Sequence, residues 1–472
     1  MKKEPWLRVL EAGVFLLLLL ALVVSAAELV ERKQSRNLFG GFLEEPELYD
    51  VLFFGDSQFM NAMLPLEMWE DYGIAGYNLA CYGSVLPTTY WTMMNALDYA
   101  APELVVISVS GMNEAHKVTN YSGDLHTALD FWPMSKTKAQ MIADLLNDPD
   151  DPDYTDIEGY RYRELGSEFV FTLGKYHSRW SELTEDDFAS RPAHSRGGES
   201  LVGVHPIWEY ELVSEDDYAE EGGYSYQYLR MAIEECRRRE IEVLLVHPAA
   251  PQYMNAQRHA NTVRSIAQEY GVGFADITYL DSIVDYAVDC FDADPHLNVS
   301  GSLKMTDYIG SYLRDHYGLA DRRSDPRYVH WNRHLETYKD EKICVLRGEE
   351  NLKNVLMLLH DPDVDVRMAV APDADLRYDD VAGVLMHNIA REHVLSGEEF
   401  DKWSCFMFPL EGYDEALSAG DMYYMERKNG CVTEYIGEAA GNAACEAFGE
   451  EYADVTVEVT ERRNGVSFIK EF

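Results

Sequence analysis

A serine in a glycine–aspartate–serine turn is the first residue of this chain with a setting that could support chemistry. Ser57 lies in the segment FGDSQ (54–58), directly after the apolar run Tyr49–Phe54 and before residues of helical character. At the carboxyl end of a strand in an open α/β sheet, ligands bind and the amides of the next helix favour negative charge. Ser57 is therefore a candidate nucleophile for acyl transfer. The same turn suits a helix N-cap equally well.

A histidine late in the chain could serve that nucleophile. His296 lies in the segment DADPHLN (292–298), just before a predicted helix. From there it could take the serine proton and later return it to a leaving group. Asp292 and Asp294 both lie close enough in the chain to orient the imidazole ring and stabilise its charged form. A plain solvated acidic loop is the alternative interpretation.

Two further segments could bind the oxyanion that forms during acyl transfer. Asn113 follows the apolar run Leu104–Val109, and its side-chain amide could donate a hydrogen bond to the oxyanion. Gly83 follows the run Gly76–Ala80 and could donate through its backbone amide. Glycine and asparagine are also ordinary turn residues, so each segment alone is a weak signal.

The elements that must position these residues alternate between strand and helix. Helices are expected at Met60–Tyr72, Pro87–Ala100, Tyr226–Arg239, Asn255–Tyr270 and Ser300–Tyr317, and strands at Tyr49–Phe54, Gly76–Ala80, Leu104–Val109, Ile241–Val246 and Gly273–Ile277. This alternation predicts an α/β fold, a doubly wound parallel sheet with right-handed crossovers. The candidate residues then meet at one edge of the sheet.

The region around 145–225 shows little periodicity and is predicted to be an insertion or lid. Its His177, Arg179 and Trp180 are candidates for contact with a sugar substrate, although local packing of the insertion on the core is the more frequent role of such residues. Asp56 in the serine turn and His247 at the end of a strand are further candidates for contact with the substrate.

The N-terminus carries a hydrophobic segment. Residues 12–27 contain no charge, and Lys2, Lys3 and Arg8 precede them, which favours a cytoplasmic N-terminus. An uncleaved signal-anchor is favoured over a signal peptide cleaved near Ser25-Ala26-Ala27. In both cases residues 31–472 lie outside the cytoplasm. The predicted localisation is the cell membrane, with a single pass and an extracytoplasmic catalytic domain.

The chain is predicted to divide into several parts. They are the anchor at 1–30, a linker at 31–46, the α/β domain at 47–322, and a small C-terminal accessory domain of mixed α/β type at 340–472. Strand-like stretches in the last part are Lys342–Leu346, Val366–Val370, Trp403–Phe408 and Val455–Val459.

Composition limits the possible partners. The formal net charge of −43 repels nucleic acid, so no nucleic-acid partner is expected. The seven cysteines include no C-x-x-C pair and match no zinc spacing, so neither a metal nor a cofactor is predicted. One disulfide could form among Cys405, Cys431 and Cys445.

The order of these segments resembles the SGNH/GDSL hydrolase superfamily. Ser57, Gly83, Asn113 and His296 match the positions of its serine, glycine, asparagine and histidine. The resemblance implies a flavodoxin-like three-layer α/β/α fold and a serine acyl-ester enzyme. Its oxyanion hole would comprise the amides of Ser57 and Gly83 and the side chain of Asn113. One departure is that the usual aspartate, three residues before the histidine, is Ala293 here. Asp292 or Asp294 could replace it, or the site could be a serine–histidine dyad.

Within the superfamily, the chain is similar to a membrane-anchored group from Gram-positive bacteria. The stretches that carry this similarity are residues 51–83, 176–188 and 292–313. The similarity implies an O-acyltransferase or esterase acting on a cell-surface polysaccharide or another acylated glycan, with a membrane-bound O-acyltransferase as partner. A catalytically silent SGNH-like module for polysaccharide binding or assembly is the alternative. A periplasmic binding protein is disfavoured, because the chain lacks two matched α/β lobes.

Overall fold

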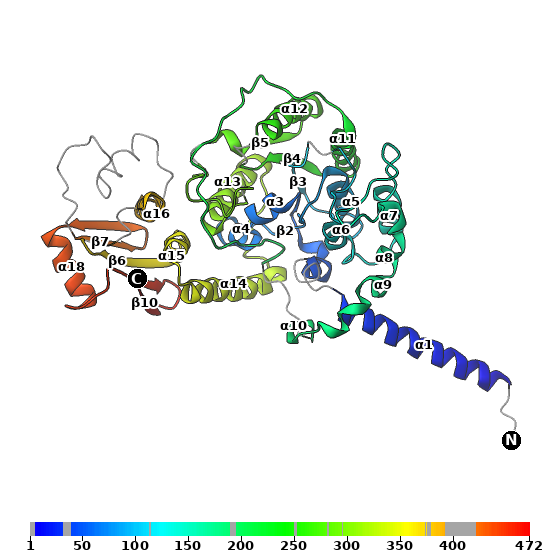
Figure 1. Cartoon of the computed structure of the whole chain (residues 1–472), viewed down its shortest axis with the longest axis horizontal. Helices are drawn as coiled ribbons and strands as arrows, with labels where there is room; N and C mark the ends of the chain where they lie inside the picture. Colours follow the sequence, from blue (N-terminus) through cyan, green and yellow to red (C-terminus); the bar gives the residue numbers. More distant parts are fainter. Residues whose placement is uncertain are drawn as a thin grey trace.

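We describe residues 5–31, 39–112, 115–188, 195–249, 253–280, 283–294, 296–372, 374, 379–391 and 422–472 in a computed structural model of the chain. Three parts follow one another in Figure 1: the N-terminal helix α1 (Pro5–Val30), an α/β domain and a smaller C-terminal domain.

The α/β domain is built on one parallel sheet of five strands. The strands are β1 (Val51–Phe54), β2 (Gly76–Asn78), β3 (Leu104–Ser108), β4 (Glu242–His247) and β5 (Gly273–Asp276). Their order is β2-β1-β3-β4-β5 and every neighbouring pair is parallel, which is the flavodoxin-like arrangement. All five predicted strands are confirmed, with shifts of one or two residues at some ends.

Helices cover both faces of this sheet. Helix α5 (Leu86–Ala96) packs against α11 (Gly223–Arg238), and α4 (Pro65–Tyr72) packs against α13 (Val299–Tyr317). Figure 1 shows these two pairs on opposite sides of the sheet, with α12 (Met254–Tyr270) beside β5. The central strands β1 and β3 are entirely buried, which explains why they are uninterrupted apolar runs in the sequence. The predicted three-layer α/β/α fold is confirmed.

The first predicted helix is wrong in its boundaries. Instead of one helix over Met60–Tyr72, the chain forms α3 (Ser57–Ala62) and then α4. Leu64, between them, is extended because a residue before proline avoids the helical region, and Pro65 then begins α4. As a result Ser57 itself is the first residue of a helix.

The insertion begins with short helices. After α6 (Ser122–Leu129) and α7 (Lys136–Leu145) come η3 (Tyr162–Glu164), α8 (Gly166–Val170), α9 (Thr172–Tyr176), η4 (His177–Ser181) and α10 (Glu185–Phe188). Described residues 195–222 then return to α11 without forming a helix or strand.

A long helix connects the two domains. After η6 (Pro326–Tyr328), α14 spans Val329–Gly348, so the predicted strand at Lys342–Leu346 is wrong. The short run ICVL suggests a strand, but Trp331, Leu335 and Tyr338 continue a helical spacing toward it and are all buried.

The C-terminal domain is an antiparallel sheet with helices. Its strands are β6 (Val364–Val370), β7 (Tyr423–Lys428), β8 (Cys431–Ile436), β9 (Val455–Glu461) and β10 (Ser467–Glu471), in the order β10-β9-β6-β7-β8. The helices are α15 (Leu352–Leu358), α16 (Asp380–Arg391) and α18 (Glu438–Phe448).

Two of the strands predicted for this domain, at Val366–Val370 and Val455–Val459, are confirmed. The stretch Trp403–Phe408 and Cys405 lie outside the described residues. Cys431 and Cys445 are free thiols, so the structure has no disulfide between them.

An acid-rich cluster lies where α4, α14 and the C-terminal domain meet. Lys342 Nζ lies 2.7 Å from Glu67, 2.9 Å from Asp361 and 3.3 Å from Asp363, and Lys339 pairs with Glu70 and Asp363. Carboxylates outnumber the two lysines here. Desolvation raises the pKa of Glu67 and of Glu70. Desolvation, followed by repulsion from Glu67, raises the pKa of Asp71 from 3.8 to about 6.

We expect Asp71→Asn to stabilise the protein at pH 7.5 but not near pH 4. The folded-state pKa of Asp71 lies above its unfolded value, so the folded state binds the extra proton between about pH 4 and pH 6. Stability from this group is present below that window and is lost as the pH rises through it. Allowing for solvent screening, the variant should gain about 1 kcal/mol at pH 7.5, roughly 2 °C in Tm.

Thermal unfolding of both proteins across pH 4–8 measures this difference. Asp321→Asn is the matched control, because Arg323 lowers the pKa of Asp321 and loss of that carboxylate should not raise Tm. A Tm difference for Asp71→Asn that is unchanged from pH 4 to pH 7.5 would contradict the prediction.

Candidate active site

Ser57 begins α3 at the carboxyl end of β1. The cap of this helix is Asp56, whose side chain accepts a hydrogen bond from the Phe59 amide at 3.4 Å. The cap is therefore the residue before Ser57, and the serine side chain is left for another partner. Gly55 makes the turn possible, because a Cβ there would lie 2.5 Å from the Cβ of Ser108 on β3.

That partner is His296. Its Nε2 lies 2.8 Å from Ser57 Oγ, although the two residues are 239 positions apart in the chain. His296 belongs to the loop before α13, which Asn298 holds in place. The Asn298 side chain caps α13 through the Gly301 amide at 3.2 Å and donates to the Val288 carbonyl oxygen at 2.7 Å.

The other ring nitrogen of His296 faces Asp292. Nδ1 lies 3.0 and 2.9 Å from the two carboxylate oxygens of Asp292. Asp292 Oδ1 also accepts from the amides of Asp294, at 3.0 Å, and His296, at 3.3 Å. The loop therefore turns around the Asp292 carboxylate. This turn brings Asp292 into contact with the His296 ring, although Asp292 lies four residues earlier in the chain.

Asp294 is directed elsewhere. Its carboxylate accepts a hydrogen bond from the hydroxyl of Tyr253, and its carbonyl oxygen accepts one from Gln58 Nε2 at 3.2 Å. Of the two aspartates that the sequence left open, Asp292 is the one in contact with the imidazole ring. Ser57, His296 and Asp292 therefore form a continuous hydrogen-bonded chain.

Asp56 takes part in a second network that the sequence did not indicate. Its Oδ2 accepts a hydrogen bond from Ser110 Oγ at 2.6 Å, and Ser110 Oγ lies 2.8 Å from Ser108 Oγ. Burial raises the pKa of Asp56, and the Ser110 hydrogen bond opposes that rise. These contacts fix the serine turn to the end of β3, so Asp56 positions the turn. In the sequence, the two serines of the segment SVS (108–110) at the end of this strand were the feature that could have indicated the network.

The loops that carry the predicted oxyanion donors converge beside this turn. The Cys81 amide donates to the Gly55 carbonyl oxygen at 3.0 Å. Gly83 follows in a left-handed conformation with φ +56°, which favours glycine, and its Cα faces the carboxylate of Asp124, from which a Cβ would lie 2.1 Å. A Cβ at Gly111 would approach the Ser84 carbonyl oxygen at 3.3 Å, so the loops after β2 and β3 are in contact. Asn113 itself lies outside the described residues.

The candidates in the insertion have other contacts. Arg179 Nη1 donates to the carbonyl oxygens of Val30 and Glu31 at 2.6 and 2.7 Å, and its Nη2 pairs with Asp187 at 2.8 Å. These bonds direct Arg179 to the end of α1. His177 Nδ1 contacts the Gly174 carbonyl oxygen, and Trp180 is exposed on the same turn.

The side chain of His247, a candidate for contact with the substrate, is fully buried at the end of β4. Its Nδ1 lies 2.9 Å from Asp276 Oδ1 and 3.2 Å from Thr278 Oγ1. Because Asp276 ends β5 and His247 ends β4, this pair joins neighbouring strands at the same sheet edge.

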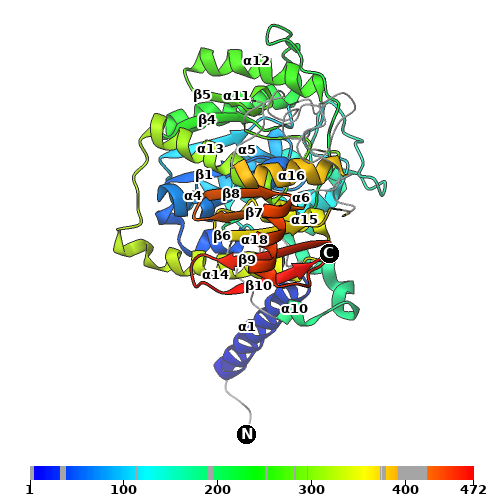
Figure 2. The same ribbon diagram turned by 90° about the vertical axis from the view of Figure 1, so that its left-hand side faces the viewer.

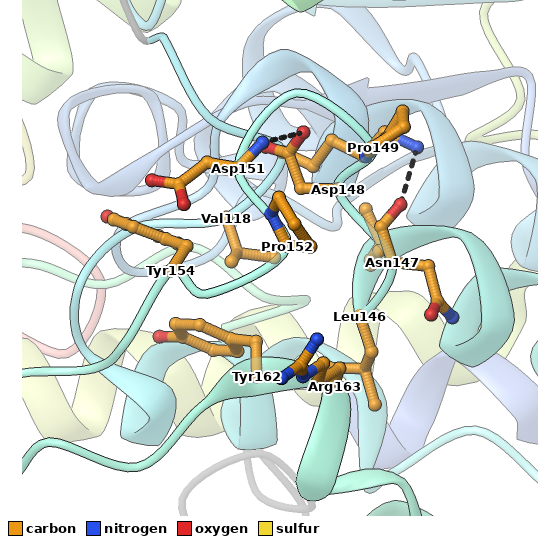
Figure 3. A pocket seen from close by; sticks show the side chains of 12 residues that line it. Val118, Leu146, Asn147, Asp148, Pro149, Asp151, Pro152, Tyr154, Tyr162 and Arg163 are labelled. Atoms are coloured by element: carbon orange, nitrogen blue, oxygen red, sulfur yellow. Dashed lines mark hydrogen bonds between the residues drawn. The ribbon is translucent and has the colours of Figure 1, made fainter.

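A cavity of about 410 Å³ lies in the insertion, apart from the serine and histidine. Figure 3 shows Tyr162 and Arg163 across from Asp148 and Asp151, with Tyr154 beside Asp151. Three of the lining charges have partners within the protein: Lys117 Nζ lies 2.7 Å from Asp144, Arg163 Nη2 lies 2.9 Å from Asp153, and Asp148 accepts from Tyr224. We therefore treat this cavity as part of the packing of the insertion.

Known proteins offer limited likeness. No family model matches the chain, and no curated protein matches it. A candidate acylhydrolase from Bacteroides fragilis NCTC 9343 is 11% identical, covers 60% of this chain and 98% of its own, and has a TM-score of 0.29. A GDSL-like lipase from Bacteroides thetaiotaomicron VPI-5482 is 12% identical, covers 58% of this chain and 89% of its own, and has a TM-score of 0.27. Because both TM-scores are low, the α/β fold is assigned from its strand order and register.

Proposed function

We propose that this chain is a serine acyl-ester enzyme of SGNH/GDSL type. Ser57 is the nucleophile, His296 the general base and acid, and Asp292 the residue that orients the ring. The observation that carries the proposal is the hydrogen-bonded chain from Ser57 Oγ through both ring nitrogens of His296 to the Asp292 carboxylate. A serine, a base within hydrogen-bond reach and a third group behind the base are the arrangement that activates a hydroxyl for acyl transfer.

The proposed reaction has two halves. His296 Nε2 takes the proton as Ser57 Oγ attacks the acyl carbonyl carbon, and a tetrahedral oxyanion forms. His296 then gives that proton to the departing alcohol oxygen, which leaves an acyl–Ser57 ester. In the second half His296 deprotonates water or a hydroxyl of an acceptor, which attacks the ester and releases Ser57. The Asp292 carboxylate stabilises the imidazolium in both halves.

The oxyanion would be bound at the start of α3 and beside Gly83. The Ser57 amide is the first of this helix, so it has no partner within the helix and carries the positive end of the local dipoles. The contact between the loops after β2 and β3 supports Gly83 and Asn113 as further donors.

The substrate is proposed to be an acylated glycan at the cell surface. Support comes from α1, whose segment Arg8–Ala27 is long and apolar enough to cross a membrane and has no residue buried inside the protein. Retained as an anchor, α1 would hold the enzyme beside a membrane-bound acyl donor, which favours transfer to a polysaccharide hydroxyl over hydrolysis. A membrane-bound O-acyltransferase is the corresponding partner.

Covalent labelling tests the proposal. A fluorophosphonate probe should label the full-length protein once, with the adduct mapped by mass spectrometry to Ser57. Ser57→Ala should not be labelled, whereas Ser311→Ala on α13 should react like the wild type. Failure of the folded wild-type protein to react would favour the alternative, a catalytically silent polysaccharide-binding or assembly module.

A further inference from the structure

The last turns of α1 pack against the insertion. Along α1 the side chains of Val23, Ala26 and Ala27 are half-buried and Val30 is fully buried, while their neighbours toward the N-terminus are exposed. This spacing places the four residues on one face of the helix. That face contacts α9, η4 and α10. The insertion therefore holds the end of the apolar helix laterally, along about two turns.

This contact has a consequence for depth in a membrane. The segment Arg8–Ala27 has 20 residues and is about 30 Å long, which matches the hydrocarbon core of a bilayer. Ala27 is the last residue of that span and Val23 lies four residues before it, so the two occupy its outermost ~6 Å. The contacts of α1 with α9, η4 and α10 lie between this end of the span and Val30, where α1 is partly covered, and this brings the three elements to the membrane interface.

Arg179 on η4 adds hydrogen bonds to the contact between α1 and the insertion. Its guanidinium donates to the carbonyl oxygens of Val30 and Glu31 at the C-terminal end of α1, and a cation there also complements the helix dipole. Backbone carbonyls near hydrocarbon need such partners, since water is scarce there. Asp187 Oδ1, at 2.8 Å, balances the charge of Arg179.

The same elements expose large apolar side chains. Phe171 before α9, Trp180 on η4 and Phe188 at the end of α10 are 52%, 54% and 68% exposed. Val170 beside Phe171 is also exposed. Figures 1 and 2 both show α10 next to the inner end of α1. Aromatic side chains at this level match the aromatic belt of membrane proteins.

We propose that Val170, Phe171, Trp180 and Phe188 form a lipid-binding surface that inserts into the outer leaflet around α1. The inference rests on the proposed retention of α1 as an anchor. The occupant is the interfacial region of the lipid bilayer, where aromatic and apolar side chains bury their surface. With a net charge of −43, attraction to anionic headgroups is not available, and Glu182 and Glu185 nearby are also exposed. Apolar insertion supplies the contact instead. Two attachments, α1 and this surface, then fix the orientation of the domain on the membrane.

Site-specific photocrosslinking in the full-length protein tests this surface. We would introduce p-benzoylphenylalanine singly at Phe171, Trp180, Phe188, Leu18 and Tyr435, and reconstitute each protein in phosphatidylcholine nanodiscs. Leu18 on α1 reports membrane insertion, and Tyr435 on β8 is an exposed aromatic control in the C-terminal domain. Irradiation should give phospholipid adducts, detected as a mass shift, at Leu18, Phe171, Trp180 and Phe188 and not at Tyr435.

Each other outcome overturns the proposal. Lipid adducts at Leu18 without adducts at Trp180 and Phe188 would show that the anchor inserts while the surface stays in water or awaits a protein partner. Absence of adducts at Leu18 would remove the anchor on which the inference rests. The fluorophosphonate reaction of Ser57 is measured on the same samples, so failure of this surface is distinguishable from failure of the proposed enzyme.

Discussion

Replacing Ser57 with alanine is expected to lower the rate of aryl-ester hydrolysis by the full-length protein at least ~10³-fold. Without Oγ no acyl-enzyme can form, and only the oxyanion donors remain to assist attack by water. The initial rate with p-nitrophenyl acetate measures the loss. Ser311→Ala is the matched control, because the Ser311 hydroxyl donates a hydrogen bond to the Tyr308 carbonyl oxygen on α13 and lies outside the proposed site.

The same experiment with His296 shows whether the two residues act as one unit. His296→Ala should cost about as much as Ser57→Ala, and the double variant should be no slower than either single variant. Additive losses would mean that serine and histidine serve separate steps. A Ser57→Ala protein that hydrolyses the ester at the wild-type rate would sink the serine mechanism altogether.

The sheet could be predicted from sequence because its strands are buried on both faces. Runs such as VLFF and LVVIS have no polar interruption, and this continuity sets both their position and their place in a parallel sheet. The sheet also brings Ser57 and His296 together, because Ser57 lies where β1 ends and His296 lies just before α13 begins. Their contact, over 239 residues, depends on topology more than on local detail.

Side-chain assignments in the loops could not be predicted in the same way. The choice between Asp292 and Asp294 depends on the backbone path of the loop between Cys290 and Leu297, which spacing alone does not determine. For Arg179 the sequence left substrate contact and local packing open, and in the structure it donates to the end of α1, 148 positions away, and to Asp187. His247 likewise looked accessible from sequence, and only the pairing of β4 with β5 shows why it is buried.

At the domain junction, a short stretch of sequence led to a wrong strand prediction. The apolar run within Lys342–Leu346 indicates a strand when it is considered alone, whereas the wider spacing from Trp331 onward is helical. Lys342 faces a cluster of carboxylates that belongs partly to α4 and partly to the C-terminal domain. No local pattern could reveal that cluster, because its members are brought together only when the two domains pack.

The assignment of Asp292 leads to a second large effect. Asp292→Asn is expected to lower kcat by ~10²–10³, with little change in KM. The asparagine Oδ1 can still accept from the amides of Asp294 and His296, so the loop keeps its shape, but the neutral amide no longer stabilises the imidazolium. The Asp292 side chain is 38% exposed, and solvent therefore shares in that stabilisation, which places the loss at the lower end of what a buried triad carboxylate supplies.

Asp294→Asn is the matched control for this variant. Asp294 is two residues away on the same loop, yet its carboxylate contacts Tyr253 and not the ring, so kcat should change only a few-fold. A greater loss in Asp294→Asn than in Asp292→Asn would reverse the assignment of the third residue. Small and equal losses in both would instead indicate a Ser57–His296 dyad, in which the loop backbone alone orients the histidine. Reaction of each variant with the fluorophosphonate probe separates these cases from simple misfolding, since a folded Asp292→Asn protein should still react, only more slowly.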